Sequence, residues 1–307
     1  MNIKLRYAIL SFIAIGALTV SCKRENENST LSKNVPTEAK DTILNQEEEK
    51  IKATINKLLF AAGNYNIIAL DSMMSDKAML GISRLKDGTW SNSEIAINNF
   101  FESVKNRERR PYSEIPNNYD ILITEGQVAL ARADCILYRW GIPQTREVNH
   151  FTFIKEDEKW KILNISWTVK DISEAKKKYD LEVFARGYAQ AWCSQRPDFV
   201  SSYFSEDGEL TVNNGETAKG AAAIKNVAKG FMDAFPDMIV SLDSLETKSD
   251  KTLFHWTLTG TNNRTGNKVK ISGFEEWTLD NKGLIQKSTG SFDENEYNRQ
   301  LEFETDK

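Results

Sequence analysis

The chain contains an internal repeat, and this repeat constrains its fold more than any other feature. Residues 64–82, NYNIIALDSMMSDKAMLGI, align without gaps with residues 194–212, SQRPDFVSSYFSEDGELTV. In each copy, helical spacing of apolar residues comes first, and alternating apolar and polar stretches joined by polar turns follow. This order predicts an α+β fold in which helices pack against a long, bent antiparallel sheet, once in each copy. The matched pairs are Leu70 with Val200, Met74 with Phe204, Ser75 with Ser205 and Leu80 with Leu210.

The amino terminus carries the pattern of an export signal. Two cations in MNIKLR precede the apolar run YAILSFIAIGALTV, and Ser21 and Cys22 follow. The run is shorter than the roughly 20 residues that a helix needs to span a bilayer. Residues 1–21 resemble a bacterial lipoprotein signal of the relaxed Bacteroidota type, cut before Cys22. The resemblance implies acyl chains on Cys22 that anchor the protein in the cell envelope. The alternative is a plain secretory signal cut nearby.

The segment that follows predicts a tether and then two domains. Residues 22–45 are rich in Asn, Glu, Lys and Ser and nearly free of aromatic residues, so they bury too little apolar surface to offset their ordering entropy. Helical apolar spacing begins near Glu47, and the chain beyond it is long enough for two cores. With the repeat, this length predicts domains at 46–170 and 171–307.

Composition and motifs argue against several classes of partner. The chain has 44 acidic against 40 basic residues, so no basic face of the kind that binds nucleic acid is expected. The two histidines, His150 and His255, have no cysteine or carboxylate at metal-ligand spacing, and no phosphate-binding glycine loop is present. We therefore expect neither a metal nor a cofactor. Cys135 and Cys193 fall in different predicted domains and are expected to be free thiols.

The second copy carries a family resemblance. Over about 180–301 it contains FPD, WTLTGT, EEW and a final FD, in an order that resembles the SnoaL-like polyketide cyclase branch of the nuclear transport factor 2 superfamily. The first copy, 47–170, resembles the more diffuse SnoaL-like group at FTFIKEDEKWKI. The resemblance implies that each domain is a cone, in which a strongly curved sheet is closed by a long helix and leaves a mostly apolar pocket open at one end.

The resemblance also locates the positions where relatives carry catalytic groups. The acid of family cyclases falls on Gly290, and the base of ketosteroid isomerases falls on Val212, so both carboxylates are missing. Tyr188 falls where the isomerases have their oxyanion-stabilising tyrosine. A phenol without a nearby base orients a carbonyl but does not enolise it. The pattern favours Tyr188 as a packed aromatic residue with a satisfied hydroxyl.

Several other residues are candidates for a ligand pocket. Alternation puts Trp256 on one strand face and His255 on the other, so His255 either lines a pocket or is hydrogen-bonded within the sheet. Arg132 and Asp134 share a face with apolar neighbours, as a surface ion pair or as polar anchors in a pocket. The candidate pocket residues are Tyr188, His255, Trp256, Trp277, Arg132 and His150, with Tyr188 and His255 also weak catalytic candidates.

Two functional hypotheses follow. The first is an envelope lipoprotein whose cones bind a small apolar ligand or a protein partner, including a second copy of the chain, without catalysis. The alternative is an enzyme of the cyclase or isomerase kind with a noncanonical site in the second domain. A cone that is open and contains converging polar groups favours chemistry, whereas a cone filled by Phe and Trp favours an interaction module.

Overall fold

The computed structural model describes residues 37–106 and 110–302. The predicted signal at 1–21, the lipidation site Cys22 and the first part of the predicted tether lie outside the described residues. A helix already begins at Thr37, so the last part of the predicted tether, 37–45, is helical instead. None of the helices in the described part of the chain has both the length and the apolar character needed to cross a bilayer.

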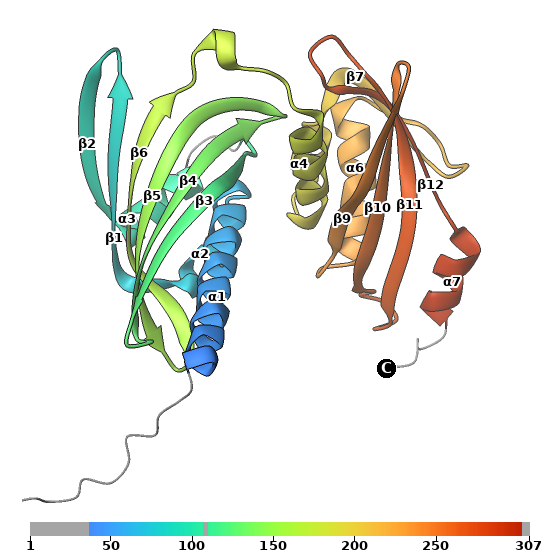
Figure 1. Ribbon diagram of the computed structural model, residues 1–307. Coiled ribbons are helices and arrows are strands. Elements are labelled where there is room, and N and C mark those ends of the chain that lie inside the picture. Colours follow the sequence, from blue (N-terminus) through green and yellow to red (C-terminus); the bar gives the residue numbers. More distant parts are fainter. Residues whose placement is uncertain (1–36, 107–109, 303–307) are drawn as a thin grey trace, which may run out of the picture.

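The first domain is a six-stranded sheet that curves around helix α1 (Figure 1). Its strands are arranged in the order β2-β1-β6-β5-β4-β3. The elements are α1 (Thr37–Gly63), α2 (Ile67–Met73), β1 (Met74–Lys86), β2 (Thr89–Ala96), α3 (Ile97–Asn106), β3 (Ser113–Thr124), β4 (Val128–Arg139), β5 (Ile142–Glu156) and β6 (Lys159–Asp171).

The second domain repeats this plan after the short helix η1 (Glu174–Lys176), with the strand order β8-β7-β12-β11-β10-β9. Two tandem α+β domains are therefore confirmed. The elements are α4 (Leu181–Cys193), α5 (Pro197–Ser201), β7 (Phe204–Val212), β8 (Ala218–Lys219), α6 (Gly220–Ala234), β9 (Ile239–Lys248), β10 (Lys251–Thr261), β11 (Lys268–Leu279), β12 (Ile285–Phe292) and α7 (Glu294–Glu302).

The expectation of wholly antiparallel sheets is corrected at one place in each domain. β1 pairs in parallel with β6, and β7 pairs in parallel with β12. After β2 or β8 the chain leaves the sheet through a helix, returns at the far edge and runs back as four antiparallel strands. The last of these strands therefore arrives beside the first strand in the same direction.

Strand pairing extends the sequence repeat into a residue-by-residue equivalence of the two domains. Across β5 and β11, this register makes Asn149 equivalent to Glu275 and Phe151 equivalent to Trp277. The pairs that carry the equivalence are Met74 with Ile162 and Leu80 with Ile165 in the first sheet, and Phe204 with Ile285 and Leu210 with Ser288 in the second.

The two cones differ in how far side chains fill them. In the second cone, the rings of Phe254 and Trp277 are fully buried and stack 4.7 Å apart. The first cone has Ala133 at the position of Phe254, and Cys135 at the position of Trp256. Folded interiors are close-packed, so replacing aromatic side chains by small ones leaves a space that neighbouring residues fill only in part. The first cone is consequently hollow, and the second is nearly full.

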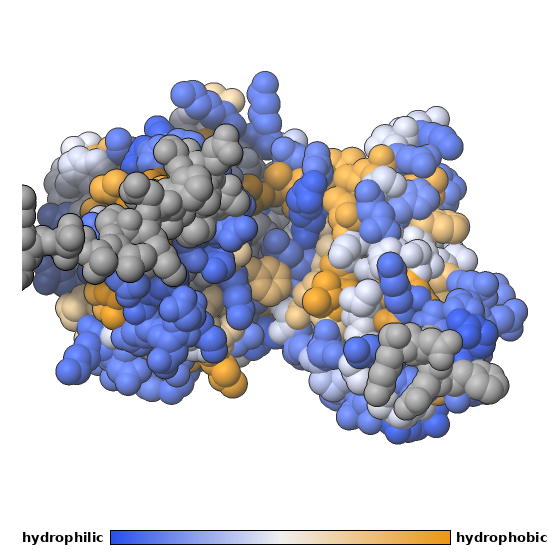
Figure 2. Space-filling model, turned by 60° about the horizontal axis from the view of Figure 1, so that its bottom comes forward, coloured by the Kyte–Doolittle hydropathy of each residue, from blue (hydrophilic) through white to orange (hydrophobic). Residues whose placement is uncertain are grey.

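A small junction joins the domains. Tyr65 and Trp140 of the first domain pack against the core of the second, and Trp140 Nε1 lies 3.4 Å from Ser202 Oγ as a hydrogen-bond donor. Ser113 Oγ donates to Gln190 Oε1 at 3.0 Å across the same junction. Figure 2 shows hydrophobic surface on the part of the second domain that faces the first. The junction therefore combines a few apolar contacts with isolated hydrogen bonds.

Candidate functional site

The interior of the first cone contains a hollow with a volume of about 840 Å³. Most of its wall is apolar, and among the polar side chains in that wall Glu147 and Asn149 are buried and Glu114 is half-buried. This composition is typical of a small-molecule site, where a few placed polar groups orient a mostly apolar ligand. The apolar wall includes Leu59, Leu70, Met74, Leu80, Phe151 and Ile165.

The polar residues are placed by strand alternation. Residues 147, 149, 151 and 153 of β5 are all buried, so Glu147 and Asn149 share the inner face with the core residues Phe151 and Phe153. Glu114 reaches the same place from β3, two strands away. Two carboxyl groups are therefore brought together on the concave side of the sheet.

Hydrogen bonds organise this cluster. Asn149 Nδ2 donates to Glu114 Oε1 at 2.6 Å and lies 3.4 Å from the sulfur of Cys135. Thr145 Oγ1 donates to Glu147 Oε1 at 2.7 Å. Among the described residues, Glu147 Oε2 has no hydrogen-bond partner. Glu147 is 7% exposed as a residue, and this oxygen is not among the fully buried atoms without a partner, so it is accessible from the cavity.

Burial shifts the acidity of the cluster. Desolvation, reinforced by the charge of Glu147, raises the pKa of Glu114 to about 7. Desolvation also raises the pKa of Glu147, although the Thr145 hydrogen bond and the Arg84 charge oppose it. Burial raises the pKa of Cys135, which keeps its thiol protonated and argues against a thiolate nucleophile. The carboxyl group of Glu114 therefore titrates near neutral pH.

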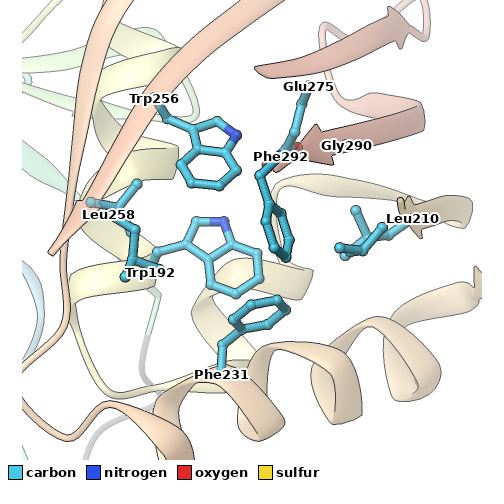
Figure 3. Close-up of a pocket in the computed structure, with 10 residues that line it drawn as sticks. Trp192, Leu210, Phe231, Trp256, Leu258, Glu275, Gly290 and Phe292 are labelled. Carbon is cyan, nitrogen blue, oxygen red and sulfur yellow. The ribbon is translucent and has the colours of Figure 1, made fainter. Parts of the chain in front are cut away.

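The second cone has only a small cavity, with a volume of about 50 Å³ (Figure 3). The rings of Trp192, Phe231, Trp256 and Phe292 surround it. Several waters fit in such a space, but a steroid or a polyketide chain does not. This cone therefore offers no open site of the kind expected for a cyclase substrate.

Both positions where relatives carry a catalytic carboxylate lie in the wall of this small cavity. Gly290 and Val212 are neighbours in register on β12 and β7, and Glu275 on β11 is the next residue across. A Cβ added at Gly290 would lie 3.4 Å from Glu275 Cγ. This is an ordinary van der Waals contact, so position 290 adjoins the acid of the adjacent strand without requiring glycine.

Glu275 corrects the expectation that Tyr188 has no acid nearby. Glu275 Oε2 accepts hydrogen bonds from Tyr188 Oη at 3.1 Å, Trp277 Nε1 at 2.9 Å and Ser288 Oγ at 2.7 Å. Burial raises the pKa of Glu275, and burial next to this acid raises the pKa of Tyr188 as well. The Tyr188 hydroxyl is satisfied within a packed polar cluster, as the packed-aromatic interpretation predicts.

The remaining predicted pocket residues are dispersed. Trp277 is fully buried, while Trp256 lines the small cavity and its buried Nε1 has no hydrogen-bond partner. His255 is not among the cavity-lining residues, and its Nε2 lies 3.6 Å from Glu246 Oε1. The fold does not bring the predicted pocket residues of the second domain together with Arg132 and His150 of the first.

In the first domain, the predicted residues lie on the outer sheet face. Arg132 bridges Asp120 and Asp134, each at 2.7 Å, so the surface ion-pair alternative describes it. His150 is exposed and pairs with Arg132 in the sheet. Neither residue lines the large cavity. No group of three or more candidate metal ligands occurs in the described part of the chain.

Comparisons with known proteins agree with this architecture. Residues 185–287 match the model of the SnoaL-like domain. No curated protein matches the chain. One similar solved structure is a hypothetical protein with a ketosteroid isomerase-like fold from Catenulispora acidiphila, which is 14% identical, with a TM-score of 0.36 over 38% of this chain and 89% of that one.

Two further solved structures have names that refer to polyketide cyclases. A candidate SnoaL-like polyketide cyclase from Jannaschia sp. CCS1 is 14% identical, with a TM-score of 0.36 over 39% of this chain and 90% of that one. A candidate polyketide cyclase from Bacillus cereus is 19% identical, with a TM-score of 0.35 over 43% and 85%. Each of the three similarities spans about the length of one domain of this chain.

Proposed function

The second domain is a SnoaL-like domain, and from this premise we propose that the first domain, not the second, is the ligand-binding unit of the protein. The first cone binds a small, mostly apolar molecule that carries one polar group directed at Glu114 and Glu147. The second cone acts as a packed partner domain without catalysis of its own.

One observation carries this proposal: the two cones have opposite interiors. The first has a hollow of about 840 Å³ with converging polar groups, whereas the second has about 50 Å³ among aromatic rings. Drug-sized ligands occupy pockets of roughly 300–1,000 Å³. Only the first of these two cones has the capacity for such a ligand in the described conformation.

A specific observation also favours acid–base chemistry as a second candidate function. The pKa of Glu114 lies at about 7, where a carboxyl group is well placed to exchange protons with a bound substrate at neutral pH. In that case Glu114→Gln would abolish turnover and leave binding of the apolar part of the substrate intact. Loss of binding without any wild-type turnover would leave ligand binding as the function.

We expect an added aromatic side chain in the first cone to weaken the binding of a ligand there. Ala133→Phe places in this cone the residue that the second cone has at the equivalent position, Phe254. Ala133 lies behind the cavity wall, beside the lining residue Asn149, so a ring at this position has to push into the hollow. Binding of the neutral aromatic dye N-phenyl-1-naphthylamine, measured by its fluorescence, is therefore expected to weaken by about tenfold or more.

The matched control is Leu130→Phe, on the outer face of the same strand, where Leu130 is 51% exposed. This variant is expected to bind the dye like the wild type. Wild-type protein that does not bind the dye, or equal loss in both variants, would contradict the assignment of the site to the first cone.

The amino-terminal signal supports a location for this function. The proposal places the protein in the bacterial cell envelope, held there by acyl chains on Cys22, with the two domains beyond the membrane surface. Cys22→Ala is expected to release the protein from the membrane fraction or to leave its signal uncleaved. Labelled palmitate that enters this variant as it enters the wild type would rule out acylation at Cys22.

A further inference from the structure

We infer that the first cone selects organic cations, namely apolar amines whose ammonium group contacts Glu114 and Glu147 while the carbon skeleton fills the hollow. This inference rests on the proposed function, because it names the class of ligand that the first cone would take. The ammonium group supplies a positive charge in direct contact with the two carboxyl groups, where so far only the unpaired charge of Arg84 acts on Glu147.

In the described part of the chain, the carboxyl pair has no cationic side chain as a direct partner. Among the described residues, no lysine or arginine forms an ion pair with Glu114 or Glu147, and the hydrogen bonds they accept come from the neutral groups of Asn149 and Thr145. Glu147 is 7% exposed, and its Oε2 has no partner in the described part of the chain. The charge of Arg84 acts on Glu147 without forming an ion pair with it, so an ammonium group would pair this carboxylate directly and donate to its free oxygen.

The other charged groups that line the cavity belong mainly to its exposed or half-buried rim. Arg84 and Glu94 are exposed on β1 and β2, and Arg139 is half-buried at the end of β4. Arg110 also lines the cavity and is exposed. Cys135, which packs beside Asn149, stays neutral because burial raises the pKa of its thiol. These rim charges are three guanidinium groups and one carboxylate, so the preference for a cation comes from the inner pair, Glu114 and Glu147, and not from the rim.

Other ligand classes fit the cluster less well. A ligand with a carboxylate would place its charge next to the carboxyl groups of Glu114 and Glu147. Like charges in contact repel strongly in a poorly solvated site. A metal ion would need more oxygen ligands, whereas Asn149 presents its NH₂ group, a donor, to Glu114. An ammonium group has three donors and no acceptor, which matches a pair of carboxyl groups.

Binding of the ammonium group is coupled to the release of a proton. Near neutral pH Glu114 is partly protonated because its pKa is raised to about 7, and a bound ammonium ion favours the ionised form. The bound complex therefore forms by exchange, in which the ammonium enters and up to one proton leaves to solvent. Affinity for the cation is expected to rise with pH up to the pKa of the pair and to level off above it.

Titration calorimetry with two probes of equal shape tests the inference. We expect 2-phenylethylammonium to bind about tenfold or more tightly than neutral 2-phenylethanol at about pH 8, and this preference to shrink at about pH 6. Buffers with different ionisation heats would reveal the released proton. Glu147→Gln is expected to abolish the preference for the ammonium. Glu156→Gln, an exposed change at the end of the same strand and outside the cavity wall, is expected to keep it.

The outcomes separate the inference from the proposed function. Equal binding of the two probes, or a preference that Glu147→Gln leaves unchanged, would overturn the inference while an apolar binding site stood. Dye binding without binding of either probe would also overturn it. Absence of dye and probe binding together would overturn both. Glu114→Gln serves as a second variant and is likewise expected to reduce the preference, should Glu147→Gln fail to fold.

Discussion

Glu275→Ala is expected to lower the free energy of unfolding of the second domain by about 3–5 kcal/mol. The substitution removes the acceptor shared by Tyr188, Trp277 and Ser288, all of which are fully buried. Three donors would then be left in the core without a partner, each costing about 1–3 kcal/mol unless water enters. Urea unfolding followed by tryptophan fluorescence measures the loss.

Glu276→Ala is the matched control because Glu276 is the next residue on the same strand and points outward. Its carboxylate forms an exposed ion pair with Lys251, and such surface pairs contribute about 0–1 kcal/mol. We therefore expect Glu276→Ala to change stability little. Equal losses in the two variants would mean that the Glu275 cluster does not hold the core together.

The sequence predicted the α+β fold of the second cone, but not its buried acid or its nearly filled interior. Alternation places Glu275 and Trp277 on one face of their strand, and the adjacent Glu276 on the other. Because a tryptophan in this position favours burial, the same alternation predicts a buried Glu275. The family positions for an acid, Gly290 and Val212, lie on the neighbouring strands β12 and β7, so the family pattern does not point to Glu275 on β11.

The hollow of the first cone was harder to predict. In VALARADCIL, the residues Ala129, Ala131, Ala133 and Cys135 face inward, while Arg132 lies on the outer face. Both faces of this strand are partly apolar, so hydrophobic periodicity alone does not identify the inner one. Small residues on an inward face predict an open interior only after the face is known.

The carboxyl pair required knowledge of the sheet order. Glu114 and Glu147 are far apart in the sequence and lie on β3 and β5, with β4 between them. The repeat predicts the order of elements along the chain, but it does not give the register across three strands. A one-residue slip in either strand would place one of these carboxyl groups on the opposite face.

Glu114→Gln is expected to make the stability of the first domain much less dependent on pH. In the folded protein the pKa of Glu114 rises from its ordinary value of 4.5 to about 7, so the native state binds a proton more tightly than the unfolded state does. The resulting stabilisation is fully present below about pH 4.5 and is lost as the pH rises to about 7. The shift corresponds to a loss on the order of 3 kcal/mol across this window, and glutamine has no proton to lose.

Urea unfolding at a series of pH values from about 4 to about 8 measures this slope, with the second-domain transition as an internal reference. Glu94→Gln, an exposed change at the rim, is expected to keep the wild-type slope. Glu147→Gln is expected to move the window to lower pH, because it removes the neighbouring charge that helps to raise the pKa of Glu114. An unchanged slope in Glu114→Gln would mean that Glu114 is solvated in the folded protein, and the hollow would then be a water-filled cleft rather than a poorly solvated site for a cation.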